Sequence, residues 1–306
     1  MRLTHRSLLL SACLLMLPAC GGEPTPEPTP APIPDPARPF VTSASVSEGA
    51  RDVYPVELFH DETASTPGIY LRKQLSVTFN TAMKASAAQV TLSNRTDTNV
   101  PPRALVGTWS ADGRTLLVTV TEPEDGGPPL EEESTYALEL TALRGAEADA
   151  PLDPAVFLGD GALDFTTSAR DGDLEHACAH TLANEPVDVQ ASAHMPVQGF
   201  PPPTDRSHAR YRVTLPDAPQ GYTELVSKPS GDEDILLYLD RNILVGVHDE
   251  AAARDIPVET KAALPVCAGI THVARFSIQG GDRVYFPRFT STPGSTFEFI
   301  LERHSR

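Results

Sequence analysis

Residues 107–120 read GTWSADGRTLLVTV, and this stretch decides the fold class. From residue 116 to residue 120 an apolar side chain stands at every second position, which is the pattern of a β-strand with one buried face. The Asp-Gly pair at residues 112–113 is a favoured turn between antiparallel strands. The stretch therefore predicts a β-hairpin.

Similar short runs recur along the whole chain. Apolar residues alternate with their neighbours at 75–79, 136–140 and 163–165, and eight further strand-like runs lie between residues 186 and 302. The chain has 30 prolines and 20 glycines, a composition that favours turns over long helices. These patterns predict an all-β protein.

The predicted strands fall into two groups, which we interpret as two antiparallel β-sandwich domains. The first covers residues 39–169, and the second, of jelly-roll type, covers residues 170–306. A charged joint with the sequence ARDGDLE begins at residue 169. Within the second domain, residues 251–262 are expected to hold one turn of helix, broken by Pro257.

The first predicted domain contains five motifs that carry a family resemblance. They are PFVTSASVSEGARDV, LSVTFNTAMKASAAQVTL, GTWSADGRTLLVTV, PLEEESTYALEL and ALDFTTSA, in this order between residues 39 and 169. Together they resemble the bacterial Ig-like domain of S-layer proteins of the SbsA type. The family's positions are filled by Phe79, Met83, Trp109, Asp112 to Leu116, Thr135, Tyr136 and Phe165 to Thr167.

The resemblance implies an Ig-like structural or interaction module without an active site. It also implies that Met83 and Trp109 belong to the core. The chain departs from the family at Ala82, where a proline is usual, and in residues 53–72, which we expect to form a longer loop. The second domain is similar to pre-peptidase C-terminal β-sandwich modules of secreted bacterial proteins only in the order and spacing of its strands.

The N-terminus has the pattern of an export signal. Arg2 and Arg6 precede an apolar run from residue 7 to residue 17, which is too short to span a membrane comfortably. Residues 17–20 read LPAC and resemble the lipobox of bacterial lipoproteins, which implies cleavage before Cys20 and lipid attachment to its sulfur. The alternative is an ordinary secretory signal cut elsewhere.

The stretch after Cys20 predicts a spacer between a membrane and the folded chain. Prolines stand at alternate positions from 24 to 36, so residues 20–38 should form an extended, polyproline-like tether. We expect the mature protein to lie outside the cytoplasm, on the outer membrane or the cell surface, with the membrane as a partner through its lipid.

The charge of the chain argues against nucleic acid as a partner. The formal net charge is −17, and loss of Arg2 and Arg6 with the signal would make it −19. Other surface proteins or glycans remain the candidate partners. The chain has no G-x-S-x-G, H-E-x-x-H, Walker or G-x-G-x-x-G motif, so we predict that it is not an enzyme and needs no cofactor.

The cysteines predict one disulfide bond. Cys13 leaves with the signal and Cys20 takes lipid, which leaves Cys178 and Cys267 as a pair in an oxidising compartment. Cys178 lies in the sequence HACAH at residues 176–180. In a strand, both histidines and the sulfur would share one face.

This histidine-rich stretch leaves three interpretations open. The favoured one is a disulfide with no metal. The second is a copper or zinc site in which His176, His180 and the Cys178 sulfur are completed by His208, or by His194 or His272. The third is a hybrid, in which the disulfide forms and His180 with His208 makes a weaker metal site.

The function predicted from the sequence is a lipid-anchored structural or adhesion protein, in which an Ig-like module presents a C-terminal binding domain. One alternative is a metal-handling lipoprotein that uses the histidines named above. Another is a glycan-binding accessory protein, for which Tyr222, Tyr238 and Phe286 would form an exposed aromatic platform.

Overall fold

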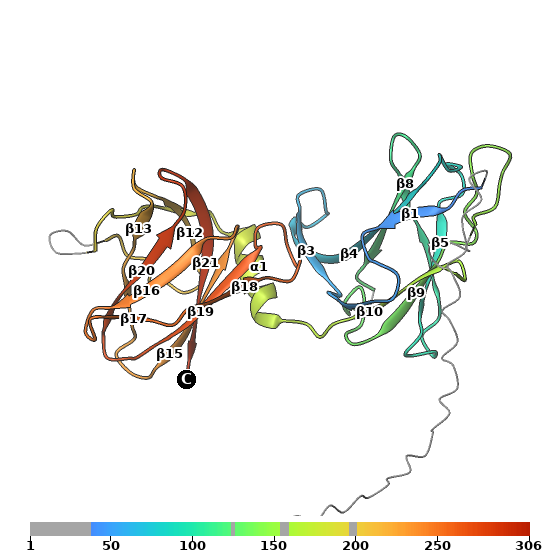
Figure 1. The fold of residues 1–306 in the computed structure, drawn as a ribbon. Helices are drawn as coiled ribbons and strands as arrows, with labels where there is room; N and C mark the ends of the chain where they lie inside the picture. Colours follow the sequence, from blue (N-terminus) through green and yellow to red (C-terminus); the bar gives the residue numbers. More distant parts are fainter. Residues whose placement is uncertain (1–37, 124–125, 154–158, 196–200) are drawn as a thin grey trace, which may run out of the picture. The chain divides into compact units, whose positions relative to one another are not determined.

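The computed structural model confirms the all-β class, with a single short helix among the residues it describes (Figure 1). The predicted signal peptide (1–19), Cys20 and residues 21–37 of the predicted tether lie outside those residues. No helix in the described part of the chain is long and apolar enough to cross a membrane. The described residues are 38–123, 126–153, 159–195 and 201–306.

The N-terminal half forms two sheets that pack face to face. The first sheet has the order β1-β4-β8-β7, with β3 beside β4, and the second has the order β2-β10-β9-β5-β6, in which only β2 and β10 are parallel. The strands of the first sheet are β1 (Val41–Ala44), β3 (Glu57–Asp61), β4 (Gly68–Phe79), β7 (Thr108–Trp109) and β8 (Thr115–Thr121). Those of the second are β2 (Ala50–Val53), β5 (Gln89–Asn94), β6 (Arg103–Val106), β9 (Thr135–Glu139) and β10 (Ala162–Thr167).

The alternating residues of this half form its core. Leu75 and Val77 on β4 pack with Leu116 and Val118 on β8, and all four are fully buried. Between β7 and β8 the chain turns at Gly113, whose φ of +68° favours glycine. The predicted hairpin at residues 107–120 is therefore confirmed.

The C-terminal half also contains two sheets with a core between them. The six-stranded sheet has the order β11-β12-β21-β15-β19-β18, and the other has the order β13-β20-β16-β17, with β14 beside β20. The six strands are β11 (Val187–Gln190), β12 (Arg210–Thr214), β15 (Glu233–Leu239), β18 (Glu259–Ala262), β19 (His272–Ile278) and β21 (Thr296–Ser305). The second sheet contains β13 (Gln220–Tyr222), β14 (Leu225–Val226), β16 (Leu244–Asp249), β17 (Arg254–Ile256) and β20 (Val284–Thr290).

Two local predictions for this half are wrong. The helical turn expected at residues 251–262 is absent, because β17 and β18 lie on either side of Pro257 and join different sheets. The HACAH stretch, whose side chains were considered above in a strand, lies in helix α1 (Gly172–Ala183).

Helix α1 has a clear local cause. The Asp171 side chain accepts a hydrogen bond from the Leu174 N–H at 3.1 Å and caps the helix. Acidic side chains in the first turn favour the positive end of the helix dipole. Leu174, Ala177 and Cys178 then give one buried face at helical spacing.

A third buried cluster links residues from both halves of the chain. The segment 53–72, expected to be a loop, contains β3 and the start of β4. Its residues Val56 and Leu58 pack in one cluster with Leu174 and Cys178, and the Leu58 N–H donates to the Val266 carbonyl at 2.9 Å. All described residues belong to one compact unit, so the division into domains at residue 169 stays a prediction.

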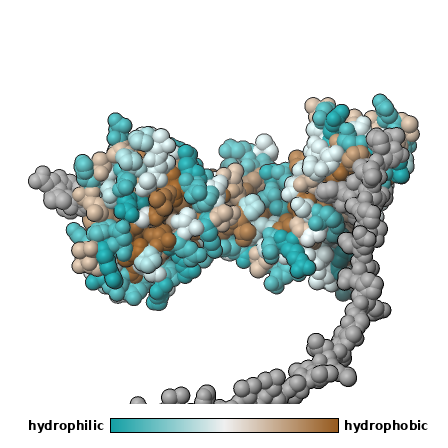
Figure 2. All heavy atoms as spheres, in the orientation of Figure 1, coloured by the Kyte–Doolittle hydropathy of each residue, from teal (hydrophilic) through white to brown (hydrophobic). Residues whose placement is uncertain are grey.

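The face of the molecule in Figure 2 carries mainly hydrophilic residues. Figure 2 shows them over most of the face in view, with hydrophobic residues in patches between them. Two of the three rings considered for a glycan platform are buried, those of Tyr238 and Phe286, and Tyr222 is half-buried. The three rings therefore do not form an exposed aromatic platform.

Candidate metal centre

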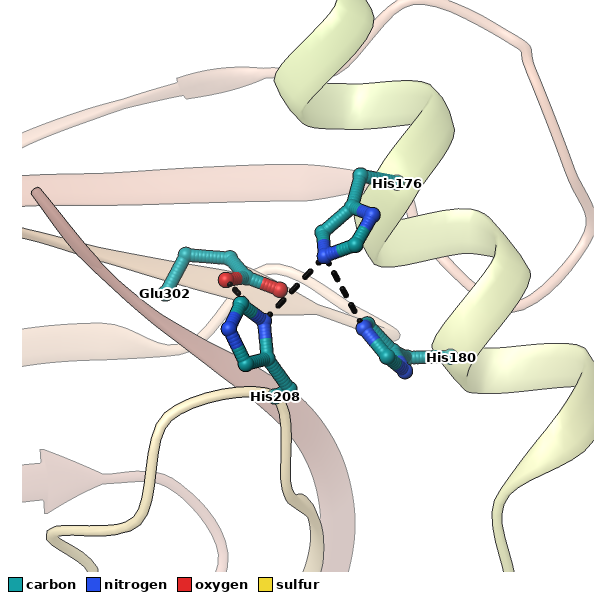
Figure 3. A group of neighbouring side chains, drawn as sticks. All are labelled: His176, His180, His208 and Glu302. Carbon is teal, nitrogen blue, oxygen red and sulfur yellow. Dashed lines mark hydrogen bonds and ion pairs between the residues drawn. The ribbon is translucent and has the colours of Figure 1, made fainter.

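Four side chains from three parts of the fold converge beside helix α1 (Figure 3). His176 and His180 lie one turn apart on the same face of the helix. His208 lies just before β12, and Glu302 lies on β21. One ligand atom from each of the four residues lies within 4.8 Å of all the others.

The distances within this cluster are close to those of metal ligands. Nε2 of His176 lies 3.0 Å from Nε2 of His180 and 3.2 Å from Nδ1 of His208. Two ligands bound tetrahedrally at about 2.0–2.1 Å from zinc are about 3.3–3.4 Å apart. The nitrogen of His176 is thus already at nearly the ligand–ligand spacing from each of the other two nitrogens.

Hydrogen bonding between the rings does not account for the cluster. Each ring nitrogen has either one proton or one lone pair. Nε2 of His176 faces two other ring nitrogens, so it cannot make two well-directed hydrogen bonds of its own. A cation in the centre would use one lone pair from each of the three nitrogens.

Glu302 provides the strongest evidence for a ligand. Its side chain is 3% exposed, and Oε2 lies 2.7 Å from Nδ1 of His208. Oε1 is buried and has no hydrogen-bond partner among the described residues. A buried carboxylate with an unpartnered oxygen is costly, and a divalent cation would offset that cost.

The backbone of His208 is held in an unusual conformation. Its φ is +63°, in the left-handed region that few residues other than glycine adopt. Its N–H donates to the Leu301 carbonyl at 2.8 Å, and its own carbonyl accepts from Nδ2 of Asn184 at 3.0 Å. These contacts fix His208 between β21 and the end of α1, and strained residues of this kind gather at functional sites.

The surroundings of His180 favour its neutral form. Burial lowers the pKa of His180, and the neighbouring His176 lowers it further. The nearby Glu302 carboxylate raises this pKa, but by less. Neutral imidazole is the form that binds metals. Nδ2 of Asn184 lies 3.2 Å from the other ring nitrogen, Nδ1, of His180 and contacts this ring on the side away from the cluster.

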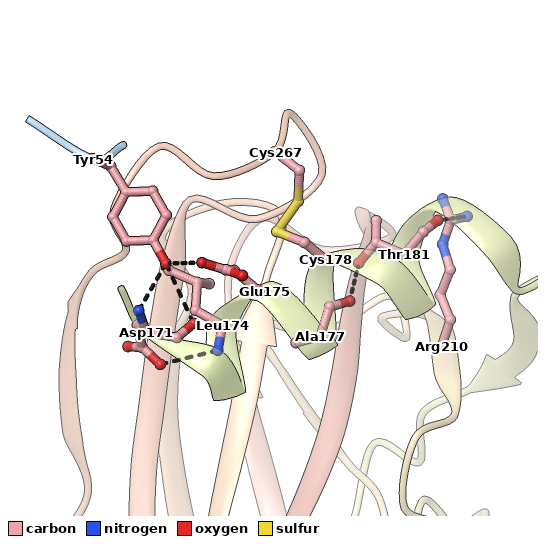
Figure 4. Close-up of a disulfide and its surroundings, with 9 residues drawn as sticks. All are labelled: Tyr54, Asp171, Leu174, Glu175, Ala177, Cys178, Thr181, Arg210 and Cys267. Carbon is pink, nitrogen blue, oxygen red and sulfur yellow. Dashed lines mark hydrogen bonds between the residues drawn. A yellow bond between two sulfur atoms is a disulfide. The ribbon is translucent and has the colours of Figure 1, made fainter. Parts of the chain in front are cut away.

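The predicted disulfide between Cys178 and Cys267 is present (Figure 4). The two Cα atoms are 5.9 Å apart, and the bond ties α1 to the loop between β18 and β19. Successive residues in a helix are about 100° apart around its axis. Cys178 is two positions from His176, so it points to nearly the opposite side of the helix. The expectation that the sulfur and both imidazoles share a face is therefore wrong.

The structure brings together three of the five histidines considered from the sequence, His176, His180 and His208, and it adds Glu302. That residue was missed, although it is an acidic residue directly after the apolar run at 299–301. His194 and His272, considered as further ligands, are not part of the cluster. No family model matches the chain, and no curated protein matches it.

Proposed function

We propose that this is a lipid-anchored, extracytoplasmic protein that binds a divalent transition-metal ion through His176, His180, His208 and Glu302. The observation that carries the proposal is the buried Glu302 carboxylate, whose Oε1 has no partner among the described residues while three imidazoles converge beside it. Three nitrogens and one oxygen suit Zn²⁺ or Cu²⁺.

The same ligand set argues against other classes of metal. Mg²⁺ and Ca²⁺ prefer sites made of oxygen atoms. Cu⁺ prefers thiolate and thioether ligands, and the thiol of Cys178 is consumed in the disulfide. The metal-handling alternative is thus better supported than a purely structural or adhesive role. No residue among those described points specifically to either of those roles.

The N-terminal sequence supports the cellular place of this function. A lipobox-like LPAC followed by a proline-rich tether fits a protein that holds its metal site at a distance from a membrane surface. The strong negative charge of the chain would also raise the local concentration of cations.

Metal titration tests the proposal directly. Purified protein, stripped with a chelator and shown to have no free thiol, is titrated with Zn²⁺ and with Cu²⁺ in a calorimeter. We expect one ion per chain with a dissociation constant well below the millimolar range. His180→Ala should weaken binding at least about tenfold, as loss of a metal-site contact does elsewhere.

His272→Ala is the matched control, because His272 contacts Thr271 and lies outside the cluster. It should leave the affinity unchanged. Binding only in the millimolar range, or equal effects of the two substitutions, would contradict the proposal.

A further inference from the structure

The proposed metal site is open on one side. Glu302 is buried beneath it, whereas His176 is exposed and the His208 side chain is 52% exposed. An ion held by these residues would therefore face solvent, where a further ligand can bind. Zinc expands to five ligands in this way, and Cu²⁺ commonly has tetragonal coordination.

The charge of the loaded site favours an anion as that ligand. Three neutral imidazoles and one carboxylate leave a divalent ion with one uncompensated positive charge. A bound metal ion is then the dominant local charge. Neutral ligands would leave it uncompensated, whereas a small anion would neutralise it.

A shallow cavity, widely open to solvent, lies beside His208 and has a place for such an anion. It has a volume of about 390 Å³, and its polar lining includes Asn184, Glu185, Arg206, Ser207 and Arg210. Arg206 and His208 belong to one turn, in which the Ala209 N–H donates to the Arg206 carbonyl at 3.4 Å. The cavity therefore borders a metal ligand and a guanidinium group of the same turn.

The two arginines of this cavity differ in their partners. Arg210 is bound to Glu298 and to the Thr181 and Asn184 carbonyls. The exposed Arg206 guanidinium has no hydrogen bond or ion pair with any described residue. Glu185 is the one carboxylate in the lining. Arg206 is therefore free to hold an anion, since arginine binds carboxylate and phosphate oxygens through two parallel hydrogen bonds.

We propose that the metal-loaded site binds a small oxyanion, a carboxylate or a phosphate, with one oxygen on the metal and another on Arg206. The inference rests on the proposed function and assigns that site a ligand. The metal supplies a Lewis-acid contact, and Arg206 supplies charge and directed hydrogen bonds.

The test uses Co²⁺ as a spectroscopic probe in the purified protein. After the bound cobalt is quantified, acetate and inorganic phosphate are titrated separately, and the visible absorption of the bound cobalt is followed. We expect a saturable spectral change with at least one anion, and the tighter anion identifies the class. Arg206→Gln should weaken that anion about tenfold without changing cobalt affinity.

Arg254→Gln is the control, because Arg254 is an exposed arginine on β17, away from the cavity lining. It should leave anion affinity unchanged. If cobalt binds but neither anion changes its spectrum, or if Arg206→Gln binds anion as wild type does, the oxyanion site is refuted while the metal site stands. Failure of cobalt itself to bind would refute the proposed function.

Discussion

Replacing Glu302 with glutamine should have opposite effects on the metal-free and the metal-bound protein. Without metal, the wild-type carboxylate is buried with an unpartnered oxygen, a defect that costs about 1–3 kcal/mol. Glutamine has the same shape and no charge, so it costs less to bury. We expect the metal-free variant to be about 1 kcal/mol more stable, which raises Tm by roughly 2–4 °C for a chain of this size.

Metal should reverse the order of the two proteins. A ligand at 100 times its dissociation constant stabilises a protein by about 2.7 kcal/mol, or roughly 5–10 °C in Tm. Glutamine removes the site's one anionic ligand, and even the loss of a partner that only orients a metal ligand costs up to about a hundredfold in affinity. At the same metal concentration the stabilisation then falls to about 0.4 kcal/mol, or roughly 1 °C.

Calorimetric melting of chelator-stripped protein, with and without Zn²⁺, measures both effects. Glu298→Gln is the matched control, because Glu298 lies on the same strand but pairs with Arg210 and Arg212. It should lower Tm in both conditions and keep the zinc shift. If Glu302→Gln instead lowers the metal-free Tm and keeps the full zinc shift, the carboxylate is not a metal ligand.

Three further predictions concern helix α1. Reduction of the disulfide, which spans 89 residues, should destabilise the protein by up to about 4–5 kcal/mol and weaken zinc binding. An unchanged zinc affinity in a titration of reduced protein would contradict the role of the bond in holding the helix. Asp171→Ala removes the helix cap and should cost about 1 kcal/mol in urea unfolding, whereas no loss would mean that the cap is not needed. Burial acts to raise the pKa of Glu175, but hydrogen bonds from Arg170 and Tyr54 outweigh it and lower the pKa below 4.5. Its carboxylate therefore stabilises the fold above pH 4.5. Glu175→Gln should lower the free energy of unfolding by about 1.5–3 kcal/mol at pH 7, and the stability difference from wild type should shrink as the pH falls below 4.5. A stability difference that does not change with pH would contradict this.

The sheets were predictable because alternation is a local signal. Leu75, Val77 and Phe79 alternate with polar residues, and the structure buries all three. The pairing of strands was not predictable in the same way. The segment 53–72 was expected to be a loop, yet its β3 strand forms because its apolar residues pack against α1, a contact between distant parts of the sequence.

Glu302 shows the same limit at the candidate site. On β21 it lies on the face of Ile300, which belongs to the cluster around α1, whereas Leu301 between them faces the other core. Its proximity to His176 depends on how the helix packs on that strand. No spacing within the sequence encodes that distance.

The histidine pair was nevertheless found with the wrong local structure, for a geometric reason. Positions four apart share a face in a strand, where side chains alternate, and also in a helix, where four residues make about one turn. His176 and His180 therefore point the same way in either case. Cys178, two positions from each, shares their face only in a strand. In the helix it points to the opposite side and pairs with Cys267. In a strand, the disulfide and the metal site would compete for the Cys178 sulfur. The helix places the sulfur and the two histidines on different faces. The disulfide that fixes α1 therefore also holds the two histidines in place.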